Sequence, residues 1–199
     1  NVYRNSSNNE CYINASYAGQ ITMTNGGVTH FKVAPSGSAD ATISWTNAMT
    51  IDNSGAVTMP LQPAFQANGS NGNNDIDASS SWNTIVFGTE RFDTNADFSS
   101  NTFTAPVTGK YQLNALVYLT NVDSASAYSE VQLKTSNKAY QAILSTNQFN
   151  GDLSYMTLMV SALADMDAND TAYVQVNIQG GTSQTDVSPG TIFSGYLAC

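Results

Sequence analysis

The side chains that could carry out catalysis are few and scattered. His30 is the only histidine, and no serine or cysteine motif accompanies it, so a Ser-His-Asp site has no support within one chain. Asp75 and Asp77 alternate in a polar segment, but nothing in their spacing separates a glycosidase pair from solvated loop carboxylates. The sequence therefore predicts a protein that is not an enzyme and has no catalytic residues.

One acidic stretch begins like a calcium loop. Asp165, Asp167 and Asn169 alternate as EF-hand ligands do, but the sixth position is Asp170 where that loop has Gly. The twelfth position is Val176 where the EF-hand has a bidentate Glu. We expect an ordinary turn and assign no metal ligand here.

The two cysteines, Cys11 and Cys199, are too few and too far apart to form a disulfide framework, so we expect two free thiols.

Four Asn-x-Ser/Thr sequons occur at about the frequency expected by chance in a chain this rich in Asn, Ser and Thr. The chain starts at Asn without a secretory leader, and we expect it to be a processed product or a part of a longer one.

Composition excludes two classes of partner. The 199 residues carry a formal net charge of -9, with six Lys+Arg against fifteen Asp+Glu and no basic cluster. The counterion release that drives nucleic-acid binding is therefore absent, and so is attraction to anionic lipid. No apolar run approaches the ~18 residues of a membrane span, so we expect no nucleic acid and no membrane insertion.

Period-two alternation recurs along the chain, and helical spacing is never sustained, so we predict an all-β protein. The clearest strand is 110–120, where Tyr111, Leu113 and Ala115 begin a series of apolar residues on one face. Six further strands are expected at 84–87, 130–134, 140–144, 155–163, 171–178 and 191–197.

The first sixty residues contain a repeated hairpin pattern. The stretches 21–29 and 49–58 each read as a short strand, a Gly-containing turn and a returning strand, at an interval of 28 residues. These hairpins contain too few apolar residues to form a hydrophobic core on their own. Either the segment packs on the following domain as extra strands, or copies from several chains form a β-rich trimeric stalk. We favour the stalk, because Pro60 and Pro63 mark a break. The predicted domains are thus residues 1–60 and 61–199.

Three motifs of the second domain resemble the C1q-like domain, a jelly-roll head related to the tumour necrosis factor fold and found in complement C1q and in some bacteriophage fibres. They are Gln62-Pro-Ala-Phe-Gln-Ala67, Phe103-Thr-Ala-Pro-Val-Thr-Gly-Lys-Tyr-Gln-Leu113 and Phe193-Ser-Gly-Tyr-Leu197. The segment 161–174 is similar to the family's turn and penultimate strand. The sequence departs from the family at Leu113 and Ala115, where aromatic residues are usual, and at Asn169, where Gly is usual.

The resemblance implies a ten-stranded jelly-roll β-sandwich that assembles as a homotrimer. In that assembly we expect Tyr111, Leu113 and Phe193 in the trimer core. No cofactor is expected, although some relatives bind calcium near the apex. Candidates for such an ion on the trimer axis would be Asp123, Asp152 and Asp186.

The resemblance also implies that both termini lie at the base of the trimer. Counting strands backward from residue 199 then places three long polar loops at the apex: 120–129, 145–154 and 180–190. Exposed aromatic rings among amides and hydroxyls suit carbohydrate or protein surfaces. We therefore expect receptor binding by these apical residues: Asp123, Tyr128, Asn147, Gln148, Phe149, Asn150, Asp152, Gln184 and Asp186.

These features together favour a bacteriophage tail-fibre head in the virion, one that recognises a host cell-surface receptor or glycan. The alternatives are a structural trimerisation or capping module of a fibre, and a secreted, extracellular C1q-like binding protein. Absence of a Gly-X-Y repeat counts against a collagenous form of the latter. Glycans at Asn68 or Asn169 would favour it.

Overall fold

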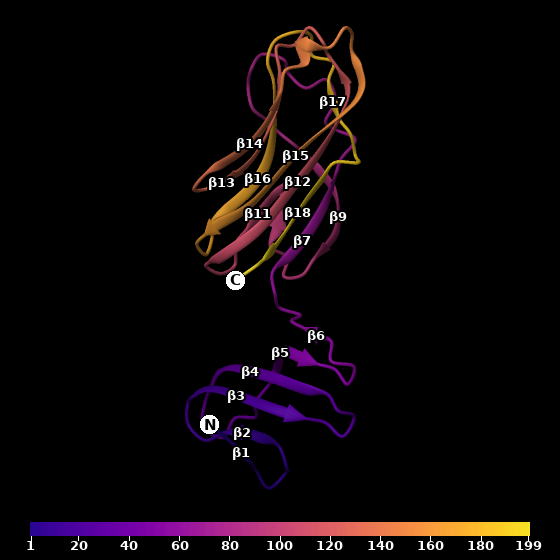
Figure 1. Cartoon of the computed structure of the whole chain (residues 1–199). Coiled ribbons are helices and arrows are strands. Elements are labelled where there is room, and N and C mark those ends of the chain that lie inside the picture. Colours follow the sequence, from indigo (N-terminus) through magenta and orange to yellow (C-terminus); the bar gives the residue numbers. More distant parts are fainter. The chain divides into compact units, whose positions relative to one another are not determined.

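The computed structural model describes residues 1–199, which divide into two compact units, Asn1–Leu61 and Gln62–Cys199. The division lies one residue beyond the boundary expected from the sequence. Each unit is built from antiparallel strands (Figure 1). The only helix is a single 3-10 turn, η1 (Thr146–Gln148), and no helix has the length and apolarity to cross a bilayer.

The first unit contains two small sheets. Strands β1 (Val2–Arg4) and β2 (Glu10–Tyr12) form a pair, while β3 (Ser16–Met23), β4 (Thr29–Gly37), β5 (Thr46–Ile51) and β6 (Val57–Thr58) form a four-stranded meander in that order. A small core of Tyr12, Ala18, Ala34 and Ile43 lies within this unit. These strands form sheets of their own, so they do not extend the sandwich of the second unit.

Both predicted hairpins are present, and their turns have the same hydrogen bonds. The Thr24 N–H donates to the carbonyl of Val28 at 2.9 Å, and the Asp52 N–H donates to that of Ala56 at 3.0 Å. Gly27 and Gly55 occupy the left-handed region, with φ of 76° and 88°, which explains why glycine recurs at this position.

The four-stranded sheet has one apolar face that the first unit leaves open. Alternation along β3 and β4, together with their register, puts Ile21 beside Phe31 on this face, and Phe31 beside Met49 of β5. The opposite face carries polar residues such as Gln20 and Lys32. We call the first of these the apolar face of the N-terminal sheet. Its most exposed members are Tyr17, Ile21, Met23, Val33 and Val57.

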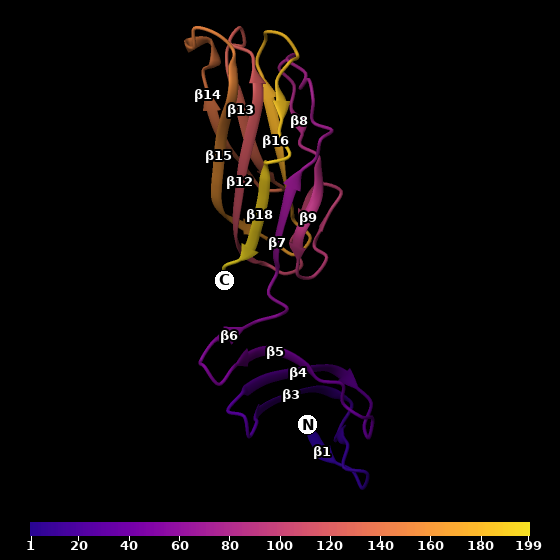
Figure 2. The same ribbon diagram turned by 90° about the vertical axis from the view of Figure 1, so that its right-hand side faces the viewer.

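The second unit is a sandwich of two six-stranded sheets (Figures 1 and 2). The β12 sheet has the order β15 (Leu153–Met166), β12 (Gly109–Val122), β18 (Ile192–Leu197), β7 (Ala64–Gly69), β9 (Phe87–Asp93), with β17 (Asp186–Val187) also paired to β12. The β16 sheet has the order β10 (Phe98–Ser99), β11 (Thr102–Thr104), β16 (Thr171–Ile178), β13 (Ser129–Thr135), β14 (Ala139–Leu144), with β8 (Asn83–Thr84) also paired to β16.

These strands confirm the all-β prediction and most of the predicted segments. The sandwich has twelve strands, where the family resemblance implied ten, and three of the twelve (β8, β10 and β17) are only two residues long. One prediction was wrong: the segment 84–87 is not a strand, since β8 ends at Thr84 and β9 begins at Phe87. Asn73 accounts for this break, because its side-chain amide pairs with both the N–H and the carbonyl of Val86.

The core lies between the two sheets and is dominated by aromatic rings. Phe65 stacks on Phe98 and Phe103, with ring centroids 5.2 and 4.6 Å apart, and meets Phe193 edge-on at 4.9 Å. Tyr111 packs against Phe103, and its hydroxyl donates to a backbone carbonyl of the loop before β12, at 2.8 Å. This core holds the long strands in the register that positions the loops at their ends.

Candidate functional site

Three polar loops gather at the end of the sandwich that lies away from residue 199 (Figures 1 and 2). They are residues 123–128 between β12 and β13, residues 145–152 between β14 and β15, and residues 179–191 between β16 and β18. We call these three segments the loop cluster. All nine residues predicted to bind a receptor lie in these three segments, and they have two different structural roles.

Asp123 joins the first loop to the third. One carboxylate oxygen accepts the backbone N–H of Ala125 at 2.7 Å, and the other accepts the N–H and hydroxyl of Thr182 at 2.6 and 2.9 Å. The bond from the Thr182 N–H is the main reason that the pKa of Asp123 lies below its usual value. The side chain is almost fully buried, so it acts as an internal tie for the loops.

Asp123 reaches this position because β12 ends in an irregular step. Asn121 has a positive φ of 52°, a conformation that Asn tolerates better than most residues. Thr120 still pairs with Tyr155, but the next pair is Val122 with Leu153, so Asn121 is skipped. The skipped residue interrupts the alternation, and the two residues that follow it are both buried.

Asp152 connects all three loops. Its carboxylate accepts the N–H and the hydroxyl of Ser124 in the first loop, each at 2.9 Å, and the side-chain amide of Gln184 in the third, also at 2.9 Å. These bonds, led by the one from the Ser124 N–H, lower the pKa of Asp152. The second loop is also held by Thr146, whose hydroxyl donates to the carbonyl of Ser126 at 2.8 Å.

Asp186 ties in a fourth segment. Its carboxylate accepts the side-chain amide of Asn121 at 2.7 Å and the backbone N–H of Asp75 at 2.8 Å. Asp75 and Asp77, considered above as a carboxylate pair, therefore lie in a segment that packs on the loop cluster. Asp77 accepts bonds from Ser79, which lower its pKa and leave it ionised.

The remaining predicted residues face outward. Asn147, Gln148, Phe149 and Asn150 are all exposed, on and just after the 3-10 turn. Tyr128 is half-buried, and its hydroxyl donates to Gln179 at 3.0 Å. The predicted set thus separates into carboxylates that fix the loops and an exposed edge of amides with one aromatic ring.

Sequence reasoning missed the hydrogen-bonding partners of these carboxylates. Asn121, Ser124, Thr146 and Thr182 are common loop residues, and their roles depend on contacts between segments far apart in the chain. Only Asn121 carried a local signal, because an Asn directly after a long alternating strand favours a left-handed step.

The expected trimer core was wrong. Tyr111, Leu113 and Phe193 are each fully buried within a single chain, with 0% of their surface exposed. They point between the two sheets of their own sandwich, so they cannot contact another subunit. The alternation correctly indicated that these residues share the buried side of their strands. The residues on the other side face outward, and only those are available to a neighbouring subunit.

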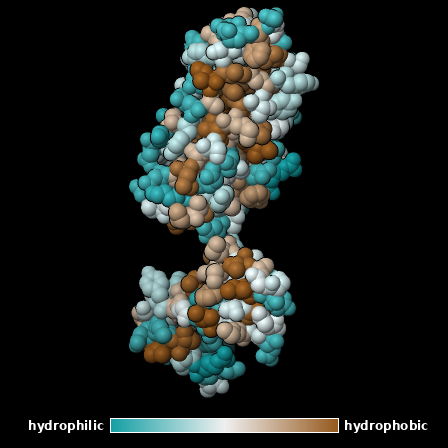
Figure 3. All heavy atoms as spheres, in the orientation of Figure 1, coloured by the Kyte–Doolittle hydropathy of each residue, from teal (hydrophilic) through white to brown (hydrophobic).

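Those outward residues form a second uncovered apolar surface. Leu116 of β12 lies between Met159 of β15 and Ile192 of β18, and the Tyr118 and Tyr155 rings approach each other at 5.8 Å. We call this surface the outer face of the β12 sheet. Its most exposed large apolar residues are Tyr155, Met159, Leu163 and Tyr196. In the space-filling view, hydrophobic residues reach the surface of both units (Figure 3).

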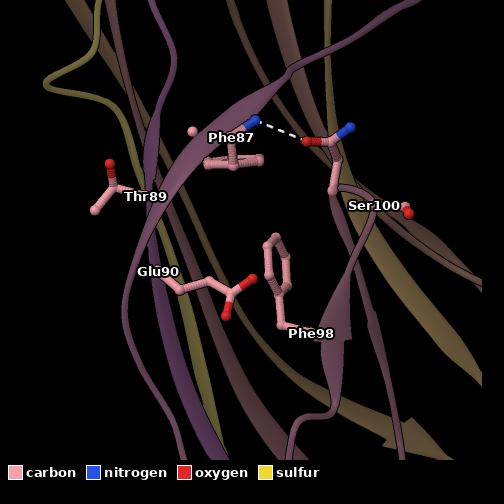
Figure 4. Close-up of a pocket in the computed structure, with 7 residues that line it drawn as sticks. Phe87, Thr89, Glu90, Phe98 and Ser100 are labelled. Carbon is pink, nitrogen blue, oxygen red and sulfur yellow. Dashed lines mark hydrogen bonds between the residues drawn. The ribbon is translucent and has the colours of Figure 1, made fainter.

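A small hollow lies elsewhere on the sandwich, between β9 and the β10–β11 hairpin (Figure 4). Its volume is about 120 Å³, below the ~300–1,000 Å³ of ordinary ligand pockets. Phe87 and Phe98 form its apolar wall, and the Phe87 N–H donates to the side chain of Asn101 at 2.8 Å. None of the predicted site residues lines this hollow.

Several other predicted groups can now be placed. Cys11 and Cys199 are both free thiols, as expected. The His30 ring pairs with the Thr50 hydroxyl at 3.1 Å.

No three His, Cys, Asp or Glu side chains of one chain are grouped to hold a metal ion. The calcium candidates Asp123 and Asp152 already accept several protein hydrogen bonds each, so a single chain offers no support for that ion.

The two face-to-face antiparallel sheets with loops gathered at one end define a jelly-roll sandwich. A family model of the C1q domain matches residues 64–198. The chain therefore belongs to the C1q domain family, whose members are generally non-enzymatic and commonly form homotrimers.

A solved structure with the same fold supports this assignment. The globular domain of zebrafish complement 1qA protein matches with a TM-score of 0.52 and 17% identity, over 69% of this chain and 98% of that one. Murine APRIL matches with a TM-score of 0.49 and 13% identity, over 68% and 98% of the two chains. A comparison with curated protein sequences finds no match.

Proposed function

We propose that this chain is the head of a trimeric fibre, in the virion of a bacteriophage, and that it binds a host cell-surface receptor or glycan through the loop cluster. The observation that carries the proposal is the locked geometry of the cluster. Asp123 and Asp152 tie the three loops together, and the exposed edge from Asn147 to Asn150 rests on this frame. A preorganised polar surface loses little conformational entropy on binding.

Trimer formation is supported by the two uncovered apolar surfaces. The outer face of the β12 sheet exposes Met159 and Leu163 on its edge strand β15, where 67% and 58% of their surfaces reach solvent in a single chain. Packing three copies through this face would bury the large apolar residues and leave the loop cluster free. Three weak receptor sites held in one rigid particle would bind a repetitive surface with a higher avidity than one site.

The apolar face of the N-terminal sheet supports the stalk in the same way. Its strands carry Ile21, Met23 and Val57 exposed on one side, and the unit has only a small core of its own. In the proposed assembly, three such sheets pack their apolar faces together. The two repeated hairpins have the same turn geometry. The apolar residues of each hairpin would therefore occupy equivalent positions in the assembly.

Adsorption to host cells and a glycan array test the receptor proposal directly. The variant combines Asn147→Ala, Gln148→Ala, Phe149→Ala and Asn150→Ala, all of which are exposed and make no contact with the Asp123 tie. The control is Val107→Ala, an exposed apolar side chain in the loop before β12, at the other end of that strand. We expect the variant to lose adsorption while remaining folded and the control to keep it. Unchanged adsorption of the variant would show that recognition lies elsewhere.

The uncovered faces also favour a second candidate, a structural trimerisation or capping module. In that case the loop variant above would leave adsorption of the whole particle unchanged. A charge on the outer face of the β12 sheet, such as Met159→Asp, would instead prevent assembly of the fibre.

A further inference from the structure

The first unit contains an open polar cavity that plays no part in the function proposed above. Its volume is about 440 Å³, within the range of ordinary small-molecule sites. Its lining includes Arg4, Glu10, Gln20, Thr22, Lys32 and Trp45. These residues come from β1 to β4 and from the segment just before β5.

Glu10 fixes the aromatic wall of this cavity. One carboxylate oxygen accepts the Trp45 indole N–H at 2.7 Å, and the other accepts the Gln20 amide at 3.1 Å and the Arg4 guanidinium at 3.0 Å. The Gln20 and Trp45 hydrogen bonds lower the pKa of Glu10. The carboxylate is therefore ionised near neutral pH and holds the half-buried indole ring in one orientation.

Unused hydrogen-bonding groups remain at the same cavity. The carbonyl oxygen of the Gln20 side chain and the hydroxyl of Thr22 are both buried and have no hydrogen-bond partner. An unsatisfied buried polar atom costs about 1–3 kcal/mol, and such atoms call for an explanation such as a bound polar molecule. A hydroxylated ligand, directly or through a water, would supply the missing partners.

The local charge of the cavity is opposite to that of the chain. Arg4 and Lys32 are two of only six Lys and Arg residues in a chain with a net charge of -9, and Glu10 is the one carboxylate in the lining. Arg4 already pairs with Glu10, whereas Lys32 forms no ion pair. The ammonium group of Lys32 is thus available for a negatively charged group of a ligand.

From these observations we propose that the N-terminal unit binds a saccharide that carries a carboxylate, such as a uronic acid unit. The apolar face of the sugar ring would lie on Trp45, its hydroxyls would bond to the Gln20 and Thr22 oxygens, and its carboxylate would pair with Lys32. A simple anion would leave the indole unused, and a neutral sugar would leave Lys32 unused.

Strand alternation keeps this cavity accessible in an assembled fibre. Gln20 and Lys32 are direct partners in the β3–β4 register, while the next pair, Ile21 with Phe31, points to the other side of the sheet. The cavity therefore lies on the face opposite to the apolar face of the N-terminal sheet. Packing of copies through the apolar face would not cover it.

Fluorescence titration of the full chain tests the proposal. Trp82 is the only other tryptophan, so Trp82→Phe leaves Trp45 as the sole reporter. The probes are a glucuronate-containing oligosaccharide, a neutral glucose oligosaccharide of the same length and inorganic phosphate. We expect the glucuronate probe to quench the Trp45 fluorescence saturably and the neutral probe to bind at least about tenfold more weakly. Phosphate should neither change the fluorescence nor compete with the glucuronate probe.

Matched variants assign the binding to the cavity. Lys32→Met should weaken glucuronate binding about tenfold and bring it close to that of the neutral sugar, while Lys134→Met, at an exposed lysine of β13, should change nothing. Thr22→Val removes an unpartnered hydroxyl, so it should leave the unfolding midpoint unchanged or raised while weakening binding. The loop-cluster variant of the preceding section should bind glucuronate normally, which separates this site from the receptor proposal.

Three results with the probes would overturn the proposal, and one with the variants would do so as well. They are the absence of saturable binding by the glucuronate probe, equal affinity for the neutral probe, and full competition by phosphate, which would indicate a general anion site. Unchanged binding in both Lys32→Met and Thr22→Val would likewise show that the saccharide does not occupy this cavity.

Discussion

Single side chains decide whether the loops of the sandwich act as one surface. Asp123 is buried, accepts three hydrogen bonds and joins two loops that are separated by almost sixty residues of sequence. Gly181, with a φ of 83°, lies so close that a β-carbon there would collide with Asp123 and Ser126. The loop cluster therefore has a packed interior of its own.

Replacing Asp123 with Ala should loosen this cluster. The substitution leaves the N–H groups of Ala125 and Thr182 without their acceptor, which should cost about 1–3 kcal/mol in the free energy of unfolding. Urea denaturation and hydrogen exchange of the Thr182 amide would measure both effects. Glu90→Ala, at an exposed carboxylate of β9, serves as the control and should change the stability by less than about 0.5 kcal/mol. Equal stability of the two variants would contradict the assigned tie.

The same carboxylates give the loop cluster a dependence on pH. The pKa values of Asp123 and Asp152 lie below their ordinary value of 3.8 in the folded chain, so the unfolded chain binds protons first as the pH falls. Their stabilisation is fully present above about pH 3.8 and is lost as the pH falls from there through the folded pKa values. As the pH is lowered from 6 to 3, the denaturation midpoint of the double variant Asp123→Asn, Asp152→Asn should fall less steeply than that of the unmodified chain. Parallel curves would contradict the assignment.

The fate of Tyr111 and Phe193 shows what a residue pattern can and cannot predict. Their alternation correctly indicated the buried side of a strand, because burial is the same physical requirement in a sheet core and in an interface. The alternation does not show whether the buried side packs against the second sheet of the same chain or against another subunit. A variant at either position would therefore unfold the sandwich, and it is the outward residues that test assembly.

At the scale of the elements, the aromatic core holds the two sheets together. Phe65 contacts rings from both sheets, namely Phe98, Phe103 and Phe193. Phe65→Ala should therefore lower the free energy of unfolding by about 3–5 kcal/mol. Phe92→Ala, at a half-exposed ring of β9, is the matched control and should cost far less. Similar losses from both variants in urea denaturation would contradict the packing described here.

The long β12–β15 pair presents the surface that most needs a partner. Met159→Asp places a charge on the outer face of the β12 sheet, on the edge strand β15 and next to Leu116 of β12. We expect a folded monomer, because Met159 is exposed in a single chain and its loss removes little of the core. Gln141→Asp, at an exposed position of β14 in the other sheet, should leave the assembly intact. Sedimentation velocity measures the difference, and a Met159→Asp trimer would exclude this face from the interface.

Elements were easier to predict than their junctions. Strands such as β12 and β16 carry a periodic apolar signal that depends only on local sequence. The two-residue strands, the Asn121 step and the Asn73 bridge to Val86 carry almost none, since they depend on hydrogen bonds between distant segments. The loops of the candidate site could thus be located from the sequence, whereas the division of their residues into internal ties and exposed groups could not.

At the scale of the whole molecule, the two units share one feature, which is an apolar sheet face that their own residues leave uncovered. In the second unit this is the outer face of the β12 sheet, and in the first it is the apolar face of the N-terminal sheet. Large exposed apolar patches on a folded chain commonly mark interfaces. The low proportion of charged residues, 11% of the chain, agrees with surfaces that pack against copies of themselves.

Light scattering coupled to size-exclusion chromatography, at micromolar concentration and neutral pH, tests this account most directly. If three copies bury these faces together, the full chain elutes as one species with three times the 21.1 kDa mass of a single chain. A stable, folded species of 21.1 kDa at that concentration would contradict the account.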